Sequence, residues 1–243
     1  AGGITVSQAF DVLSMGVGED GTSGFPLVTC YLTGKELRAA AEVDASVTPI
    51  MPAAQLYMSG MVYTFNPHRM FFNRVTSCWL EEPSFATGLL EREMSRIEDD
   101  QLYRVVTGMY SAQMLGTVKE KSLGLLSLEP KDENGVPITD FATRVLRDGN
   151  GSEIKEWYAL AAYLQSFGDE GVPERYGMPK GDGRKSVDRS WNPIELLRSP
   201  NWITLVTLLA AAAVLAAAVL LVRALVRRVR LRRYGGGRKR YRG

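Results

Sequence analysis

The sequence predicts an α+β domain followed by one transmembrane helix. Within residues 1–168, short runs rich in β-branched and aromatic residues are mixed with runs whose apolar residues recur at helical spacing. A charged segment rich in Gly and Pro follows at 169–200, and we interpret it as a linker. An uncharged stretch at 201–222 and an Arg-rich end at 223–243 complete the chain. These features predict a layered mixed-sheet domain, a linker, a membrane span and a tail, in that order.

The domain is expected to begin with a short helix, a strand and a second helix. Ser7 can cap the first helix, over residues 7–16. The run PLVTCYL at 26–32 is rich in residues that favour strands. Thr33 and Glu36 then have the spacing of a capping box, which predicts that the second helix starts there.

Three more strands are expected in the first half of the chain. They lie at 56–65, 74–80 and 102–107. Gly60 is expected to form a bulge in the first of them. The polar run at 66–73 is expected to form the turn between the first two.

The end of the domain is expected to hold a strand, a turn and a helix. TRVLRD at 143–148 predicts a strand that runs into the Asp-Gly-Asn-Gly turn at 148–151. Within 153–167, aromatic and aliphatic residues recur at helical spacing, and Gly168 follows. We therefore expect an amphipathic helix that packs on a sheet.

The stretch at 201–222 has the length and composition of a membrane span. It holds no charged residue, and about 20 helical residues cross the hydrocarbon core of a bilayer. Eleven of its residues are Leu, Ile or Val, and together they favour insertion by about −3 to −7 kcal/mol. Trp202 at one end suits the headgroup boundary. We predict a single membrane-spanning helix here.

The charges on the two sides of this span predict its orientation. No acidic residue follows Glu195, and 223–243 holds nine Arg and one Lys, a net charge of +10. The other 19 basic and 27 acidic residues give the preceding part a net charge of −8. Short segments rich in Lys and Arg stay in the cytoplasm. The tail is therefore expected inside the cell membrane and residues 1–200 outside it.

The tail is expected to contact anionic lipid rather than nucleic acid. Each basic group near an anionic leaflet adds about 1 kcal/mol of attraction. In nucleic-acid binding, Tyr234 and Tyr241 would stack on bases, but so short a tail offers little room for specific readout. The Ala-rich span and the Arg-rich end together favour a bacterial protein.

The residues that build catalytic sites are scarce in this chain. His68 is the single histidine, and it lies in the polar turn NPHR. A dinuclear phosphoesterase site needs several His and Asp ligands, and a zinc site takes three or four ligands from Cys, His and carboxylate groups. Cys30 and Cys78 lie in separate strand-like runs, and we expect free buried thiols, with a disulfide as the alternative. No catalytic residue, metal site or cofactor is expected in this chain.

Five runs occur in a characteristic order: ITVSQAFDVLSMG, LVTCYLTGKELRAAAE, YMSGMVYTFNPHRMFFNRV, LYRVVTGMYSA and EWYALAAYLQSF. Their order and spacing, over about residues 3–168, resemble the C-terminal domain of the 5′-nucleotidase family. The L-T-G-x-x-L step of that family is matched at 32–37. Its S-G-x-x-Y-T-Y-D-P-S-R run is matched in outline at 59–69, and its Y-x-V at 103–105.

The resemblance implies how the work is divided along a longer chain. In that family an N-terminal metallophosphatase domain holds two metal ions, and the C-terminal domain supplies a nucleoside pocket in which two aromatic side chains clamp the base. We therefore interpret this chain as the back half of a surface-anchored hydrolase whose divalent metals lie in a missing N-terminal domain. The implied substrate is a 5′-nucleotide or a related phosphoester, and the implied partners are the catalytic domain and the membrane.

Tyr110 and Phe25 are the substrate-binding residues that the resemblance implies. Tyr110 falls where the second base-stacking aromatic of the family lies. Phe25 lies in the loop that carries the first, although an ungapped alignment of the L-T-G step places Leu27 there. Alternatively, Tyr110 packs into the core and touches no ligand.

The sequence also departs from the family after Tyr110. Met114–Thr117 replaces the family's Gly-Gly-Asp-Gly run, and Met109 replaces an Asn. Glycine lets a backbone approach a ligand closely, so the pocket is expected to be altered or the substrate to differ. The alternative function is a non-enzymatic, membrane-tethered module that binds a ligand or a partner. Arg69 and Arg74 either meet a phosphate group or balance the acidic body.

Overall fold

The structure, a computed structural model, describes residues 3–52, 55–84, 91–121, 127–177 and 183–235. The chain divides into two compact units, Ala1–Ser190 and Trp191–Gly243. The first unit is an α+β domain, and the second holds the long helix that follows it.

The elements follow one another in an order that mixes helices and strands. They are α1 Val6–Leu13, β1 Leu27–Thr33, α2 Gly34–Val47, β2 Met61–Phe65, β3 Val75–Ser84, β4 Glu91–Arg96, β5 Leu102–Gly108, α3 Met109–Lys121, η2 Phe141–Arg144, α4 Glu156–Gln165, η3 Gly168–Glu170, η4 Glu174–Gly177, β6 Lys185–Val187, α5 Pro193–Leu196 and α6 Trp202–Gly235.

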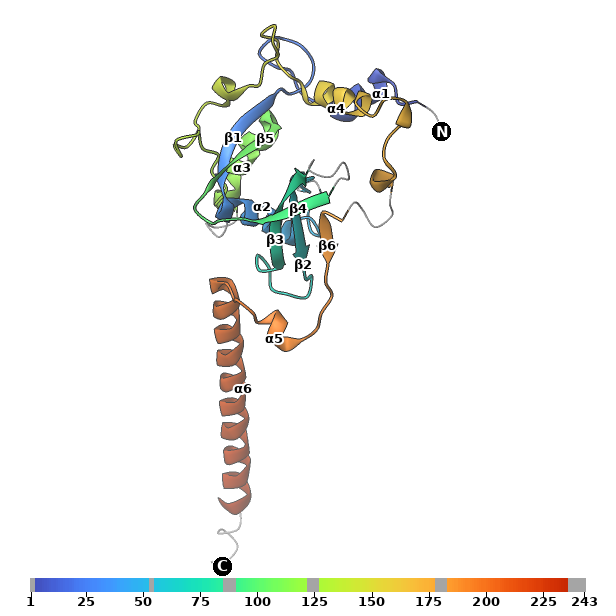
Figure 1. The fold of residues 1–243 in the computed structure, drawn as a ribbon. Coiled ribbons are helices and arrows are strands. Elements are labelled where there is room, and N and C mark those ends of the chain that lie inside the picture. The colour runs from blue at the N-terminus through green and yellow to red at the C-terminus, as the bar shows by residue number, and fades with distance from the viewer. Residues whose placement is uncertain (1–2, 53–54, 85–90, 122–126, 178–182, 236–243) are drawn as a thin grey trace, which may run out of the picture. The chain divides into compact units, whose positions relative to one another are not determined.

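Two sheets form the first unit (Figure 1). In the smaller sheet, β1 and β5 pair antiparallel, with Leu27 opposite Gly108. The larger sheet has the strand order β4-β3-β2-β6. Its first three strands are antiparallel neighbours, whereas β6 lies parallel to β2. The predicted mixed α+β architecture is therefore confirmed.

The predicted capping box starts α2. The backbone N–H of Glu36 donates to Thr33 Oγ1 at 3.3 Å, and the backbone N–H of Thr33 donates to Glu36 Oε2 at 2.8 Å. The carboxylate of Glu36 also accepts from Lys131 Nζ at 2.5 Å. One buried carboxylate thus satisfies the first turn of α2 and holds a distant loop against it.

The main core lies between α2 and the larger sheet. Its buried members are Ala41, Ala45, Met61, Tyr63, Phe65, Cys78 and Ile97. The alternating burial of β2, in which Met61, Tyr63 and Phe65 point inward, places one face of the strand on α2. Cys30 and Cys78 are both free and buried, as expected, and they lie in different sheets.

Part of the range predicted as a linker is built into the first unit. Residues 185–187 form β6, in which Tyr63 of β2 lies opposite Lys185. The backbone N–H of Tyr63 donates to the carbonyl oxygen of Arg184 at 2.9 Å. The chain is therefore attached to the larger sheet shortly before it leaves the first unit.

Two local predictions near the start of the domain were wrong. Thr5, not Ser7, caps α1, and Gln8 completes a capping box there. Gly60 lies before β2 with φ +77, while the bulge of the β2–β3 pair falls at Thr64 and Phe65.

The predicted strand at 143–148 was also wrong in form. Its start belongs to η2, a 3₁₀ turn, and its remainder makes only isolated bridges, Val28 with Val145 and Arg147 with Glu153.

The expectation that the last helix of the domain packs on a sheet was wrong as well. α4 packs against α1, and the ring centroids of Phe10 and Trp157 lie 5.4 Å apart in an edge-to-face arrangement.

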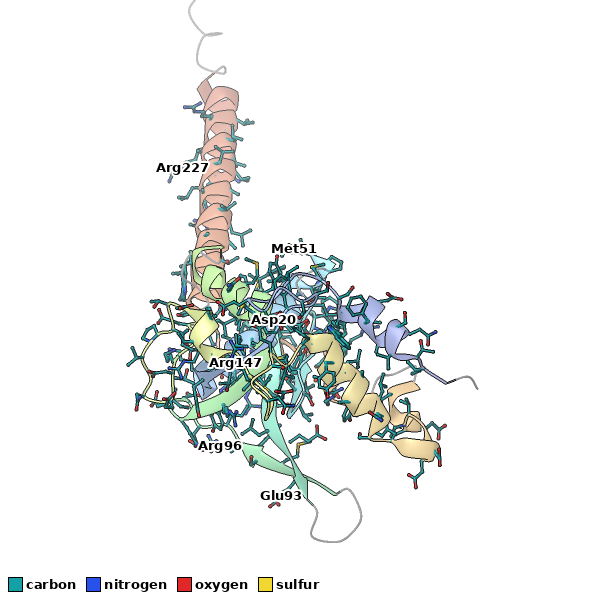
Figure 2. All side chains as sticks on the ribbon, turned by 90° about the horizontal axis from the view of Figure 1, so that it is seen from above. Asp20, Met51, Glu93, Arg96, Arg147 and Arg227 are labelled. Atoms are coloured by element: carbon teal, nitrogen blue, oxygen red, sulfur yellow. The ribbon has the colours of Figure 1, made fainter. Side chains whose placement is uncertain are left out.

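The second unit contains one helix that could span a membrane. Within α6, Trp202–Arg230 is long and apolar enough to cross a bilayer, with a mean hydropathy of 2.9 in its most apolar window. The helix continues past the predicted end of the span at residue 222, and Figure 2 shows Arg227 projecting from this extension.

Candidate functional site

Phe25 is held in place by backbone hydrogen bonds on both sides of its loop. The N–H of Phe25 donates to the carbonyl oxygen of Met15 at 2.9 Å. The N–H of Gly24 donates to the carbonyl oxygen of Gly16, also at 2.9 Å. The carbonyl oxygen of Phe25 accepts from the N–H of Glu156 at 3.1 Å. The loop before β1 is thus fixed between the end of α1 and the start of α4.

The ring of Phe25 lies directly on the backbone of Gly16. A Cβ atom at Gly16 would fall 2.4, 2.5 and 2.6 Å from three carbons of the ring. Gly16 also has φ +83, a conformation that side-chain-bearing residues avoid. Glycine at this position therefore permits the observed place of the Phe25 ring.

Tyr110 lies next to Phe25, just after β5, the other strand of the smaller sheet. β5 ends at Gly108, opposite Leu27, and α3 begins at once with Met109. The N–H of Met109 donates to the carbonyl oxygen of Pro26 at 2.9 Å, which fixes the start of α3 against the loop. The side chain of Tyr110 remains 49% exposed.

The two rings stack on each other. The ring centroids of Phe25 and Tyr110 are 5.7 Å apart, and the ring planes differ by 19°. A flat ligand between them needs a contact of about 3.5 Å on each side, or roughly 7 Å in all. One ring must therefore move before a base can enter between them. Phe25 rests on Gly16 whereas Tyr110 is about half exposed, so Tyr110 has the more open surroundings of the two.

Family comparison places this ring pair in a known domain. Residues 1–119 match the family model described as 5′-nucleotidase, C-terminal domain. This part of the chain belongs to the 5′-nucleotidase C-terminal domain family. Phe25 and Tyr110 both lie within the matched residues, whereas Glu156 lies beyond them.

Solved structures with similar folds include two nucleotidases. A 5′-nucleotidase precursor from Thermus thermophilus is 21% identical, with a TM-score of 0.48, and the match covers 77% of this chain and 28% of that one. The NAD nucleotidase of Haemophilus influenzae is 15% identical, with a TM-score of 0.41, covering 76% and 27% respectively. The chain spans less than a third of either protein. No curated protein matches it.

In this 5′-nucleotidase C-terminal domain, the segment after Tyr110, where a departure from the family was expected, is helical. Met114–Thr117, which stands where the family has a glycine-rich loop, is part of α3. Inside a helix the backbone N–H groups bond within the helix. This segment therefore does not offer them to a ligand, unlike a glycine-rich loop.

The resemblance implies two metal ions in a separate catalytic domain, and the described residues of this C-terminal domain do not fit a metal ion. Within the described ranges, no group of three or more His, Cys, Asp or Glu side chains is placed to hold a metal ion. The single histidine, His68, lies in a turn, where its N–H donates to Asn66 Oδ1 at 2.9 Å.

The two candidate phosphate-binding arginines are both packed into the domain. Arg69 is 7% exposed, so it is not a charge on the surface of the domain. Arg74 donates from Nη1 to the carbonyl oxygen of Ala45 at 3.0 Å, and its guanidinium lies 4.6 Å from the centroid of the Phe71 ring. Burial lowers the pKa of Arg74, while the charge of Glu42 acts in the opposite direction.

Sequence reasoning missed two residues that shape the ring pair. Gly16 supports the Phe25 ring, and Glu156 binds its backbone. Gly16 is nine positions before Phe25, at the end of the first predicted helix, and no local pattern linked it to that ring. Nothing near Glu156 in the sequence pointed to Phe25, because a pairing between distant segments brings them together.

Proposed function

We propose that residues 1–168 are the substrate-binding half of a membrane-anchored nucleotide phosphohydrolase. Phosphate release would occur in a metal-bearing catalytic domain that precedes Ala1 in the natural protein. Family membership of residues 1–119 supports this assignment. The observation that carries it is the stacked pair of Phe25 and Tyr110 at the end of the smaller sheet.

The ring pair would bind the base of a nucleoside or nucleotide by stacking. Stacking of a base on an aromatic side chain contributes about 1–3 kcal/mol and tolerates different bases. In our proposal Tyr110 swings away from Phe25, the base enters, and both faces of the base are covered. Phe25 stays on Gly16 and defines one wall of the pocket.

The first experiment measures nucleoside affinity of the chain in detergent. Tyr110→Ala is expected to weaken adenosine or guanosine binding about tenfold or more, because one stacking face is lost. Tyr57→Ala is the control, since Tyr57 is 88% exposed and lies outside the pair. Equal affinities for the Tyr110→Ala variant and the natural chain would mean that Tyr110 only packs against Phe25.

The second experiment separates binding from hydrolysis. The 243-residue chain is expected to release no phosphate from AMP when a divalent metal is added, whereas the natural protein that includes the upstream domain is expected to do so. Phosphate release by the chain alone would overturn the proposed division between the two halves.

The third experiment tests the proposed anchoring, with residues 1–200 outside the cell and the tail inside. Protease added to intact cells is expected to degrade the first unit and to spare the Arg-rich end. Loss of the tail with retention of the first unit would invert this topology.

The helix at Met114–Thr117 favours a second candidate, a non-enzymatic, membrane-tethered module that binds a ligand or a partner. A helix in place of a glycine-rich loop changes how a ligand could be held. The coding sequence upstream of Ala1 decides between the two: metal-binding Asp and His motifs support the hydrolase, and a signal peptide joined directly to Ala1 supports the module.

A further inference from the structure

Glu156 lies directly beside Phe25 across a strand pairing. Pro26 and Lys155 form an antiparallel bridge, so Phe25 and Glu156 are opposite each other. The N–H of Glu156 donates to the carbonyl oxygen of Phe25 at 3.1 Å. The first residue of α4 is therefore fixed next to Phe25, just before β1 begins.

The side chain of Glu156 extends to Gly108 at the end of β5. Its Oε1 atom lies 1.3 Å from the point where Gly108 would carry a Cβ atom. Gly108 pairs with Leu27 and stands two positions before Tyr110. The carboxylate thus occupies the space that a side chain at Gly108 would fill, between the segments that carry the two rings.

This carboxylate has no partner in the part of the chain that the structure describes. No hydrogen bond or ion pair reaches it there, and burial raises its pKa. Two carboxylates that are more deeply buried are paired, Glu153 with Lys155 at 2.6 Å and Glu36 with Lys131 at 2.5 Å. Glu156 is only partly buried, but removing even part of a carboxylate from water without a partner is unfavourable, and a ligand that needs its oxygens would account for its place.

Favourable interaction with the helix dipole does not account for the position of this side chain. Glu156 is the first residue of α4, where a carboxylate is stabilised by the helix N-terminus. The side chain instead extends to Gly108 at the end of β5, and the N-cap residue of α4, Lys155, makes no side-chain capping hydrogen bond.

We propose that Glu156 accepts hydrogen bonds from two adjacent donors of the bound nucleoside and thereby selects it. Two sources present such a pair: the N1–H and 2-amino group of guanine, and the 2′- and 3′-hydroxyls of ribose. A carboxylate matches either pair, because its two oxygens accept side by side. This proposal rests on the proposed function, since it requires a nucleoside at the Phe25–Tyr110 pair.

The test is a cycle of ligand and protein changes, read as dissociation constants for the full chain in detergent. The ligands are guanosine, inosine, which lacks the 2-amino group, and 2′-deoxyguanosine. In the natural chain one of these deletions is expected to weaken binding about tenfold, the scale of a hydrogen bond to a charged group. In Glu156→Gln the same deletion is expected to change affinity less than about twofold.

Which deletion loses its effect identifies the source of the donors. If Glu156→Gln binds inosine as well as guanosine, the carboxylate accepts from the base edge. If it binds 2′-deoxyguanosine as well as guanosine, the carboxylate accepts from the ribose. Glu19→Gln is the control, because Glu19 is exposed, and it is expected to keep both penalties.

A second variant keeps the carboxylate and moves it. In Gly108→Ala the new methyl group would collide with Oε1 at 1.3 Å, so the variant is expected to lose the same discrimination as Glu156→Gln. A thermal unfolding curve for each variant shows that it is folded.

The results also separate this proposal from the function on which it rests. If the natural chain binds no nucleoside, both fail. If Tyr110→Ala abolishes binding while Glu156→Gln and Gly108→Ala retain both penalties, the ring pair is the pocket and Glu156 plays no part in selection.

Discussion

The Nζ atom of Lys185 lies 2.5 Å from Oδ2 of Asp44, and this ion pair attaches β6 to α2. The side chain of Asp44 is fully buried and also accepts from the N–H of Leu56 at 3.0 Å, from Thr48 Oγ1 at 2.9 Å and from the hydroxyl of Tyr63. One carboxylate thus joins α2, the larger sheet and the segment that precedes α6.

Removing the Lys185 charge is expected to loosen β6. In Lys185→Met, Asp44 loses its cation, and we expect the free energy of unfolding of the first unit to fall by about 2 kcal/mol, below the 3–5 kcal/mol of a fully buried pair because Lys185 is partly exposed. Urea unfolding measures the change. Lys35→Met, at an exposed position of α2, is expected to change the stability by less than about 0.5 kcal/mol.

Limited proteolysis provides the second readout for the same pair. Cleavage within 183–190 is expected to accelerate in Lys185→Met and to stay unchanged in Lys35→Met. Equal cleavage rates in the two variants would show that strand pairing alone holds β6.

Acid is expected to destabilise the first unit through Asp44. Burial works to raise the pKa of Asp44, but the hydrogen bonds from Lys185 and Tyr63 outweigh it, and the pKa lies below the ordinary 3.8. A carboxyl group whose pKa is lower in the folded state stabilises the fold above its unfolded pKa, and this contribution is lost as the pH falls through the folded pKa.

The measurement compares the natural chain with Asp44→Asn by urea unfolding from pH 7 to pH 2. The stability difference is expected to stay constant down to about pH 5 and to shrink below the unfolded pKa of 3.8. A difference that stays the same down to pH 2 would show that Asp44 is not the group that titrates.

Local signals predicted α2 well and β6 not at all. The capping box of Thr33 and Glu36 is complete within four residues, so the sequence alone identifies it. β6 has three residues in a polar segment, and its position depends on pairing with β2 and on Asp44, which precedes Lys185 by 141 positions. A sequence pattern of a few residues cannot predict a contact between residues that far apart in the chain.

The candidate site was predictable only in part for the same reason. Tyr110 and Phe25 could be chosen from their motifs, although an ungapped alignment of the L-T-G step placed Leu27 at the position of Phe25. In that register Leu27 pairs with Gly108, while Phe25, two residues earlier, stacks on Tyr110. Their role in binding stays a prediction.

Adding one methyl group at Gly16 is expected to displace the Phe25 ring. Gly16→Ala places a Cβ atom within 2.6 Å of three ring carbons and forces alanine to φ +83. We expect a loss of about 3 kcal/mol in the free energy of unfolding, from strain and displacement together. Nucleoside affinity is expected to fall at least about fivefold as the fixed wall of the pocket moves.

Gly21→Ala separates strain from displacement. Gly21 has φ +73, but a Cβ atom there meets nothing within 4 Å. The variant is expected to lose only about 1 kcal/mol of stability and to keep its nucleoside affinity. If both alanine variants weaken binding equally, the contact between Gly16 and Phe25 does not shape the pocket.

The two thiols are expected to react only when the domain opens. Burial raises the pKa of Cys30 and of Cys78 to about 11, so thiolate is rare near pH 8, and both residues are buried. With iodoacetamide at pH 8, the folded chain is expected to remain unlabelled while the chain in 8 M urea takes up two labels, which mass spectrometry counts.

Because Cys30 lies in the smaller sheet and Cys78 in the larger, the order in which they become labelled at intermediate urea concentrations reports which sheet opens first. Rapid labelling of either thiol in the folded chain would contradict its burial, and a urea-unfolded chain that takes up no label without reductant would mean that the two form a disulfide.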